Sequence, residues 1–107
     1  MGANNGALTE AVYYILLSLL QPMHGYGIMQ NVERLSAGRV HLAAGTLYGA
    51  ISTMLERGWI TALDGGSDSR KKEYVMTDTG RGMLRAEYVR LRELVENGRA
   101  LLEEEEQ

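Results

Sequence analysis

The stretch GTLYGAISTMLERGWITALDGGSDSRKKEYVM, residues 45–76, decides the fold because it joins a helical pattern to two strand-like runs. In its helical part, residues 45–57, apolar side chains recur at helical spacing along one stripe. That stripe consists of Leu47, Ile51, Met54 and Leu55, and the opposite face carries Thr46, Gly49, Ala50, Ser52 and Thr53. A helix face made of small and polar side chains can enter the major groove of DNA. We therefore interpret residues 45–57 as a candidate recognition helix.

The rest of this stretch has the pattern of a β-hairpin. Gly58 is placed to end the helix in a left-handed conformation, in which glycine carries no steric penalty. Strand-like runs at 59–63 and 72–76 flank a loop of turn-forming residues at 64–69. The second run opens with the one run of three consecutive cations in the chain, Arg70, Lys71 and Lys72. The hairpin is therefore predicted to be a positively charged wing.

Two further amphipathic helices precede the recognition helix. The first is expected over residues 8–20 and must end before Pro22, and the second is expected over residues 26–35. A short strand is expected at 40–42. Three helices and a hairpin in this order predict a mainly α (α+β) fold, with a winged helix-turn-helix domain over residues 1–76. The alternative is a generic three-helix domain with a hairpin.

The last third of the chain has the pattern of one long helix. Thr77 is a suitable N-cap, and no proline interrupts residues 77–107. Apolar positions then alternate steps of four and three residues, as in the seam of a coiled coil. At 1.5 Å per residue a helix of roughly 28 residues would be about 42 Å long, more than a small winged domain can cover. We therefore expect residues 77–107 to form a dimerisation helix that ends in the acidic tail Glu103–Glu106. The predicted dimer contacts are Leu84, Tyr88, Leu91, Leu94, Val95 and Leu102.

A different packing of this helix is also open at this stage. The apolar stripe could fold back on the winged domain of its own chain instead of meeting a second copy. Its first residues, such as Met83 and Leu84, are the best placed for such contacts because they lie nearest the wing. Gly98 weakens the seam by about 1 kcal/mol relative to alanine.

Composition narrows the class of protein. The 107 residues are enough for one domain, and 45% hydrophobic and 23% charged residues are ordinary for a globular protein. The absence of cysteine excludes disulfides and thiolate metal sites, and the two histidines lack a helical ligand spacing, so no metal or cofactor is expected. We find no nucleophile motif and predict no enzyme. There is neither a membrane-length apolar run nor a signal peptide, so a cytoplasmic protein without membrane contact is expected.

The charge of the chain allows two classes of partner. A formal net charge of −3 is unusual for a protein that must neutralise phosphates. The four glutamates at 103–106 account for it, since removing their charge from −3 leaves +1 on residues 1–102. A basic wing on a near-neutral body is compatible with double-stranded DNA. The acidic total also fits a rival class, a winged-helix adaptor that binds another protein and no DNA.

Four segments carry a family resemblance. They are His24–Ile28, Gly45–Ile51, Leu55–Ile60 and Arg70–Gly80. Taken together these segments closely resemble the PadR family of bacterial transcriptional regulators, in its compact subgroup with a single C-terminal dimerisation helix. The likeness extends over about residues 8–102. It implies a homodimeric, ligand-responsive repressor that binds an inverted repeat in DNA.

The predicted site residues follow from these elements. The expected DNA contacts are Thr46, Tyr48, Gly49, Ser52, Thr53, Arg70, Lys71 and Lys72. Alternate residues of a strand point to opposite sides, so Arg70 and Lys72 would share one side and Lys71 the other. Tyr26 and Tyr48 could either pack in the core or reach a phosphate, because a tyrosine has an apolar ring and a polar tip. A small-molecule effector, if there is one, is expected between the winged domain and the C-terminal helix, near Tyr14, Met83 and Tyr88.

Overall fold

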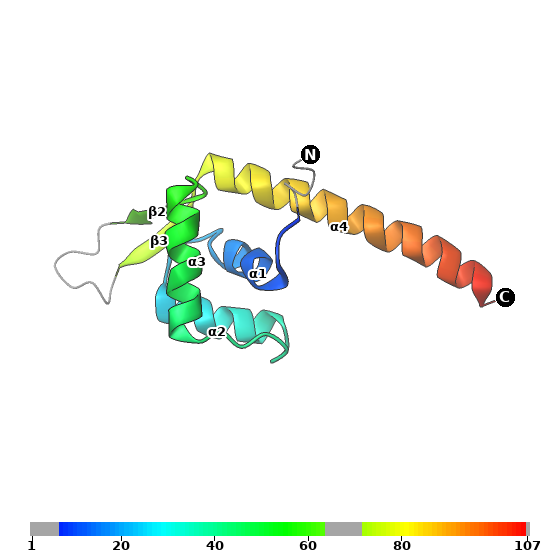
Figure 1. Cartoon of the computed structure of the whole chain (residues 1–107), viewed down its shortest axis with the longest axis horizontal. Helices are drawn as coiled ribbons and strands as arrows, with labels where there is room; N and C mark the ends of the chain where they lie inside the picture. The colour runs from blue at the N-terminus through cyan, green and yellow to red at the C-terminus, as the bar shows by residue number, and fades with distance from the viewer. Residues whose placement is uncertain (1–6, 64–71, 107) are drawn as a thin grey trace.

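The computed structural model describes residues 7–63 and 72–106, which form four helices and three short strands (Figure 1). In chain order these are α1 (Glu10–Ser18), β1 (Met23–His24), α2 (Gly25–Leu35), α3 (Ala44–Glu56), β2 (Ile60–Leu63), β3 (Glu73–Met76) and α4 (Asp78–Glu105). This is the predicted mainly helical fold with a small antiparallel sheet. No helix in the described part of the chain is long and apolar enough to cross a membrane. The cytoplasmic location expected from the sequence stays a prediction.

The core lies where the first three helices meet the inner face of the sheet. Its buried side chains come from one stripe of each helix and from alternate positions of the strands. They include Ile15, Leu16 and Leu19 of the first helical segment, Ile28 and Val32 of α2, Leu47, Ile51 and Met54 of α3, and Tyr74 and Met76 of β3. Leu55, which was predicted to share the apolar stripe of α3, is 38% exposed instead. The stripe is therefore narrower than the sequence indicated.

The sheet contains a strand that was not predicted. Its order is β1-β3-β2 with antiparallel pairing, and Met23 of β1 lies opposite Tyr74 of β3. Met23 and His24 lie between the two predicted helices, where no strand was expected, and a strand was predicted at Val40–Leu42 instead. That expectation is wrong, because residues 40–42 have no regular structure. The free edge of β3 accepts the segment that leaves α1, and the Met76 amide also donates to the Leu19 carbonyl at 3.0 Å.

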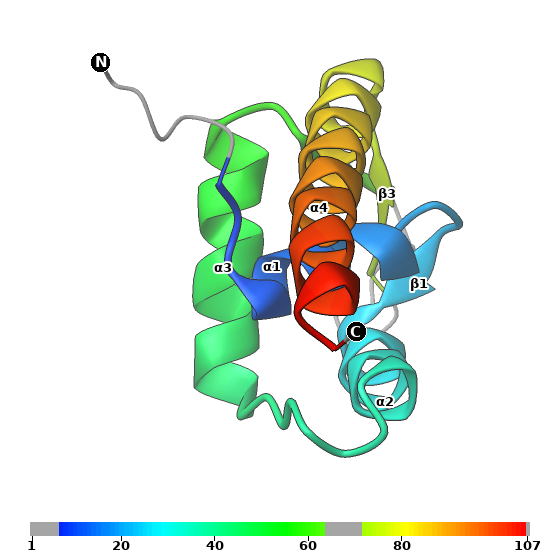
Figure 2. The same ribbon diagram turned by 90° about the vertical axis from the view of Figure 1, so that its right-hand side faces the viewer.

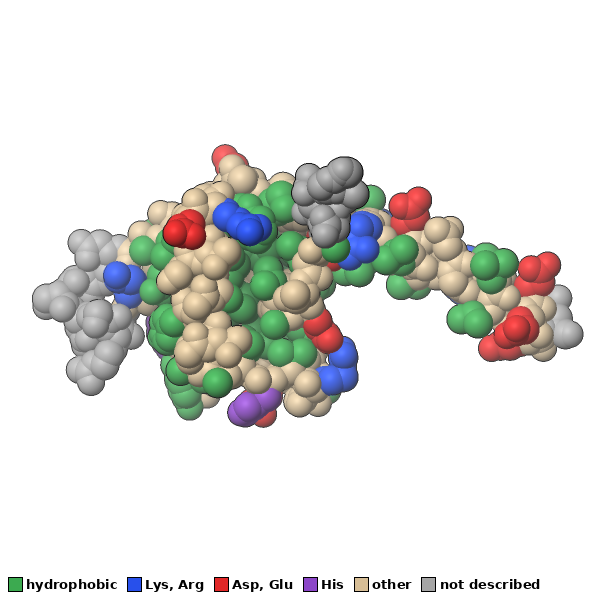
Figure 3. Space-filling model, in the orientation of Figure 1, with side chains coloured by type: hydrophobic (Ala, Val, Ile, Leu, Met, Phe, Trp, Pro, Cys, Tyr) green, Lys and Arg blue, Asp and Glu red, His purple; other side chains and the backbone are tan. Residues whose placement is uncertain are grey.

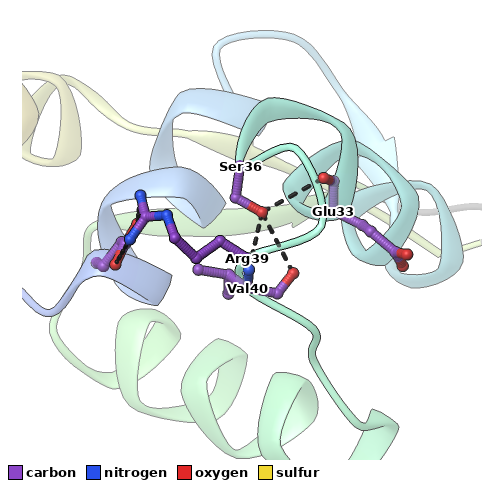
Figure 4. Close-up of polar contacts among 5 residues, drawn as sticks. Glu33, Ser36, Arg39 and Val40 are labelled. Carbon is purple, nitrogen blue, oxygen red and sulfur yellow. Dashed lines mark hydrogen bonds and ion pairs between the residues drawn. The ribbon is translucent and has the colours of Figure 1, made fainter.

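The turn between α2 and α3 is held by a buried serine (Figure 4). The Ser36 hydroxyl accepts a hydrogen bond from the Val40 amide at 2.9 Å and lies 3.3 Å from the Glu33 carbonyl, to which it can donate. Arg39, in the same turn, forms an ion pair with Glu10 of α1. These contacts satisfy the backbone of the turn locally. They explain why Val40 needs no partner strand, and they fix the turn that positions α3.

The C-terminal helix begins as the sequence predicted. Thr77 is its N-cap, and its side chain accepts a hydrogen bond from the Gly80 amide. Leu84 is buried in the core of its own chain, as the fold-back alternative allowed for the first turns. Viewed from the end, α4 lies in front of α1, with α3 to one side (Figure 2). Its C-terminal half extends away from the other elements (Figure 1). The division into a winged domain and a separate helix therefore stays a prediction, since the start of α4 belongs to the core.

Candidate nucleic-acid interface

The outer face of α3 is exposed along its length. Burial of Leu47, Ile51 and Met54 turns the opposite side of the helix to solvent. All five predicted contacts on this helix are exposed: Thr46, Tyr48, Gly49, Ser52 and Thr53. The surface over α3 is largely uncharged in Figure 3. The geometry of a small-residue helix face presented to solvent is therefore present.

Two glycines leave part of this face of α3 without side chains. A Cβ atom placed on Gly45 or on Gly49 would meet no other atom within 4 Å. Both lie in the regular helix α3, where glycine costs about 1 kcal/mol relative to alanine. Packing within the chain does not require glycine at either position. Their effect is to leave the backbone of α3 open to close approach by a partner.

The N-terminus of α3 is free of side-chain caps. Ala43 occupies the N-cap position and makes no capping hydrogen bond. The first amides of a helix lack intrahelical partners and carry the positive end of the helix dipole. Small exposed residues, Ala43 to Gly45, surround these amides. A DNA phosphate could therefore be bound at this end of the helix.

Tyr48 connects two of the sequence motifs. A Cβ atom on Gly25 would lie 2.1 Å from the Tyr48 hydroxyl oxygen, so glycine at the start of α2 leaves the space that this hydroxyl occupies. Tyr48 is 47% exposed and Tyr26 is 64% exposed. Neither tyrosine belongs to the buried core, which was the other interpretation of these two residues. Both phenol side chains are exposed, Tyr26 on α2 and Tyr48 on α3.

His24 has a structural role in the same region. It is the N-cap of α2, and its Nδ1 accepts a hydrogen bond from the Gly27 amide at 3.1 Å. A Cβ atom on Gly27 would come within 3.0 Å of the Met23 side chain. Residues 23–27 therefore form a compact cap. Within the described residues no cluster of histidine and acidic side chains could hold a metal ion.

The wing is described only at its base. Lys72 is exposed immediately before β3. Arg70 and Lys71, the other two predicted wing contacts, lie outside the described residues. At the C-terminal end of α3, the guanidinium of Arg57 lies 5.4 Å from the centre of the Trp59 ring, a cation–π contact that was not predicted.

Hydrogen bonds and close packing connect the wing to α4. The Thr77 amide donates to the Trp59 carbonyl at 2.9 Å, and the Thr77 hydroxyl donates to the Gly58 carbonyl at 2.6 Å. Gly58 has a φ of 75°, the left-handed conformation expected from the sequence. A Cβ atom on Gly80 would lie 2.0 Å from the Trp59 carbonyl oxygen. The glycine three residues after Thr77 is thus required by close packing of α4 on the connection between α3 and β2.

A groove separates α1 from α4. It encloses about 460 Å³ and is lined by Tyr13, Leu17, Leu20, Arg81, Leu84, Arg85 and Tyr88. Of the three predicted effector residues it contains Tyr88, whereas Tyr14 and Met83 are not among its lining residues. Burial raises the pKa of the Tyr13 phenol, with nearby Tyr88 and Glu87 adding to the effect. Four of the six predicted dimer contacts are exposed, namely Tyr88, Leu94, Val95 and Leu102.

Sequence reasoning missed one buried charge on α4. Glu87 is 2% exposed, and its carboxylate accepts hydrogen bonds from Nε and Nη2 of Arg90 at 2.8 and 2.6 Å. It also accepts one from the Leu8 amide at 3.2 Å. The hydrogen bonds from Arg90 hold the pKa of this carboxyl below its ordinary value, against the opposing effect of burial. The i, i+3 spacing of the two residues was the available signal. No sequence pattern indicated the hydrogen bond between the Leu8 amide and Glu87.

The fold is that of a winged helix-turn-helix protein. It has three helices with a tight turn before the exposed α3, and a hairpin that carries a positive charge where it joins the domain. The model of the transcriptional regulator PadR-like family matches residues 15–86. The chain therefore belongs to the PadR-like family of transcriptional regulators, as its motifs predicted. This is a family of regulators and not of enzymes, which confirms the prediction that the chain is not an enzyme.

Solved structures with the same fold agree with this assignment. A PadR family transcriptional regulator from Eggerthella lenta DSM 2243 is 27% identical over 86% of this chain and 80% of its own, with a TM-score of 0.69. A PadR family transcription regulator from Clostridium difficile R20291 is 22% identical, covering 85% of this chain and 97% of its own, with a TM-score of 0.66. Bacillus subtilis PadR in complex with operator DNA is 21% identical, covering 70% of this chain and 44% of its own, with a TM-score of 0.56. The last two likenesses concern the fold alone. No curated protein matches the chain.

Proposed function

We propose that this regulator is a ligand-responsive repressor that binds an inverted repeat in double-stranded DNA as a homodimer. The observation that carries the proposal is the exposed face of α3, on which Gly49, Ser52 and Thr53 stand clear of the core. Side chains of this size can lie against base edges in a major groove. A two-fold dimer predicts a two-fold operator.

The other contacts divide by their chemistry. Tyr26, Tyr48 and the open N-terminus of α3 offer hydrogen-bond donors that suit phosphate oxygens. Lys72 at the base of the wing offers a positive charge, and Arg70 and Lys71 are predicted to add to it. Phosphate contacts of this kind fix the position of a protein on DNA and depend strongly on salt concentration. The helix face would supply the sequence preference.

The experiment uses fluorescence anisotropy with a pseudo-palindromic duplex from the promoter region of the gene and a scrambled duplex of the same composition. Replacing Gly49→Leu should weaken operator binding about 10- to 100-fold, the equivalent of roughly 1–3 kcal/mol of lost discrimination. The fold should be retained because the new side chain meets open space. Gly82→Leu is the matched control, since Gly82 is also a helical glycine with nothing within 4 Å of its Cβ position.

Salt separates anchoring from sequence recognition in the same assay. Lys72→Gln should weaken binding to both duplexes alike and reduce the slope of log affinity against log salt by about 0.9 for each phosphate that is no longer neutralised. Gly49→Leu should leave that slope unchanged. If the unmodified protein binds neither duplex at low salt, the repressor proposal fails and the protein-binding adaptor becomes the better interpretation.

The effector remains a prediction within this proposal. The groove between α1 and α4 supports it, because a ligand there would touch Tyr88 and could change how α4 is held against the winged unit. Shifts of NMR amide signals on adding a candidate effector should therefore concentrate on α1 and the start of α4. Shifts confined to the acidic tail or to the wing would contradict this location.

A further inference from the structure

The two histidines of the chain lie in different surroundings. His24 is the N-cap of α2, and its Nδ1 accepts a hydrogen bond from the Gly27 amide. His41 lies in the segment between α2 and α3, and its Nδ1 is 3.1 Å from Oε1 of Glu33. The side chain of His41 is 76% exposed. Histidine changes its charge between pH 5 and 8, so both rings can titrate in this range.

The contact with Glu33 decides which nitrogen of the His41 ring carries the proton. An ionised carboxylate accepts hydrogen bonds and cannot donate them, so the bond requires a proton on Nδ1 of His41. In the neutral ring Nε2 is then an acceptor. A second proton converts Nε2 into a donor and leaves the hydrogen bond to Glu33 intact. The neutral ring therefore repels an acceptor such as a phosphate oxygen at Nε2, whereas the charged ring can bind it.

Protonation of His24 has a different consequence. Its Nδ1 is the acceptor for the Gly27 amide, so a proton on this nitrogen would remove the side-chain cap of α2. A charged His24 loses its hydrogen bond, and a charged His41 keeps the bond to Glu33. His41 is therefore the histidine that can gain charge without a change in the fold.

His41 is placed close to the start of the candidate recognition helix. It stands two residues before Ala43, the N-cap of α3, and two extended residues span at most about 7 Å. The segment is held in place because the Ser36 hydroxyl accepts a hydrogen bond from the Val40 amide at 2.9 Å (Figure 4). The proposed function places DNA phosphates beside this end of α3. An exposed imidazole on a fixed segment is thus within reach of the same backbone.

Few other charges act on His41. Glu33 of α2 faces it directly. The nearby cations of this segment and of the end of α2 have partners of their own; they are Arg39, which pairs with Glu10 of α1, and Arg34, which donates to Asn31. Helix α3 carries no charged side chain before Glu56. The charge of this surface therefore depends on His41, because its protonation neutralises Glu33.

We propose that protonated His41 contacts a DNA phosphate beside the N-terminus of α3, so that the operator is bound more tightly at mildly acidic pH. The inference rests on the proposed DNA-binding function and adds a pH response to it. Protonation supplies a hydrogen-bond donor and a positive charge, and it offsets the repulsion between the Glu33 carboxylate and the phosphate. DNA binding is therefore linked to the uptake of up to one proton by each protomer, and affinity falls as pH rises through the titration of His41.

Fluorescence anisotropy with the operator and the scrambled duplex measures this response at pH 6 and pH 8, with the salt concentration held constant. The unmodified chain should bind both duplexes more tightly at pH 6, by roughly two- to fivefold for each protomer, as expected for an exposed charge pair. The two duplexes should change alike because a phosphate contact carries no sequence information. The slope of log affinity against log salt should be steeper at pH 6 by about 0.9 for each phosphate that is contacted.

Three variants assign the response to one side chain. His41→Gln cannot titrate and should bind equally at both pH values, as weakly as the unmodified chain does at pH 8. His41→Arg is charged throughout and should bind at pH 8 about as tightly as the unmodified chain does at pH 6. The matched control is His24→Asn, which removes the other imidazole and keeps a capping side chain on α2, so it should retain the full response. A response that persists in His41→Gln, or that is lost in His24→Asn, would overturn the assignment.

Glu33→Gln tests the contribution of the neighbouring carboxylate. It removes the repulsion between Glu33 and the phosphate, so this variant should bind more tightly than the unmodified chain at pH 8. The ratio of its affinities at pH 6 and pH 8 should be smaller than that of the unmodified chain. An unchanged affinity at pH 8 together with an unchanged ratio would overturn the part given to Glu33.

The outcomes separate this inference from the proposed function. Operator binding by the unmodified chain that is equally tight at pH 6 and pH 8 overturns the role of His41 and retains the repressor. The absence of DNA binding at both pH values and at low salt overturns both. A response that is lost in His41→Gln and retained in His24→Asn supports the phosphate contact.

Discussion

Replacing Gly80→Ala should destabilise the fold, although alanine is the better helix former. The new Cβ would lie 2.0 Å from the carbonyl oxygen of Trp59 and 2.6 Å from the Cγ of Met76. The carbonyl belongs to the backbone and accepts the hydrogen bond from the Thr77 amide, so no side-chain rotation can relieve the contact. Either α4 must move away from the wing or the connection between α3 and β2 must shift.

The magnitude follows from three contributions. Overpacking of a well-packed site costs about 1–3 kcal/mol. Loss of the hydrogen bond between Thr77 and Trp59 would add about 1 kcal/mol. The helix propensity of alanine offsets about 1 kcal/mol. Gly82→Ala is the matched control on the same helix, because it gains the propensity and its Cβ meets nothing within 4 Å.

The two variants should therefore differ by about 2–4 kcal/mol, since the gain in propensity is common to both and cancels. At roughly 4–8 °C per kcal/mol, Gly80→Ala should melt on the order of 10 °C or more below Gly82→Ala. Thermal unfolding followed by circular dichroism at one fixed protein concentration measures this difference, because dimer formation makes melting depend on concentration. Equal melting temperatures would refute the argument that the Trp59 carbonyl requires glycine at position 80.

Two other substitutions test contacts that hold the site in place. The pKa of Glu87 is lowered in the folded chain, so its carboxylate stabilises the fold above the unfolded value of about 4.3, and the stabilisation is lost as pH falls through the folded pKa. Glu87→Gln should thus lower the free energy of unfolding by about 1–2 kcal/mol at pH 7 and by progressively less below pH ~4, as measured by urea unfolding. The control Glu96→Gln breaks an exposed ion pair of the same spacing and should have little effect on the free energy of unfolding. If the destabilisation caused by Glu87→Gln did not vary with pH, the role given to the carboxylate would be contradicted. Gly25→Ala should displace the Tyr48 hydroxyl and reduce operator binding several-fold, with little loss of stability because the flexible tyrosine can move. Fluorescence anisotropy titrations measure this binding for Gly25→Ala and for Tyr48→Phe. If Tyr48→Phe binds the operator more weakly and Gly25→Ala binds it as the unmodified chain does, the hydroxyl is not displaced and the reasoning is wrong.

Local pattern was sufficient for most of the elements. The spacing of Leu47, Ile51 and Met54 located α3 and its buried side, because an amphipathic helix repeats its apolar positions every three or four residues. Thr77 and Gly58 marked the start of α4 and the end of α3, since capping and left-handed turns depend on single residues. The same local chemistry gave the PadR motifs, and with them the family.

Only the tertiary structure decided which surfaces meet. Met23 and His24 became a strand because β3, about fifty residues later in the chain, offered a free edge. The Glu87 carboxylate is buried against the Leu8 amide, 79 residues away in sequence, and Gly25 leaves room for Tyr48. A periodic pattern records which side of an element is apolar and contains no information about its neighbour. Those contacts depend on the packing of the whole chain. Only after the helices and the sheet are assembled do the close approaches at Gly25 and Gly80, and the groove between α1 and α4, appear.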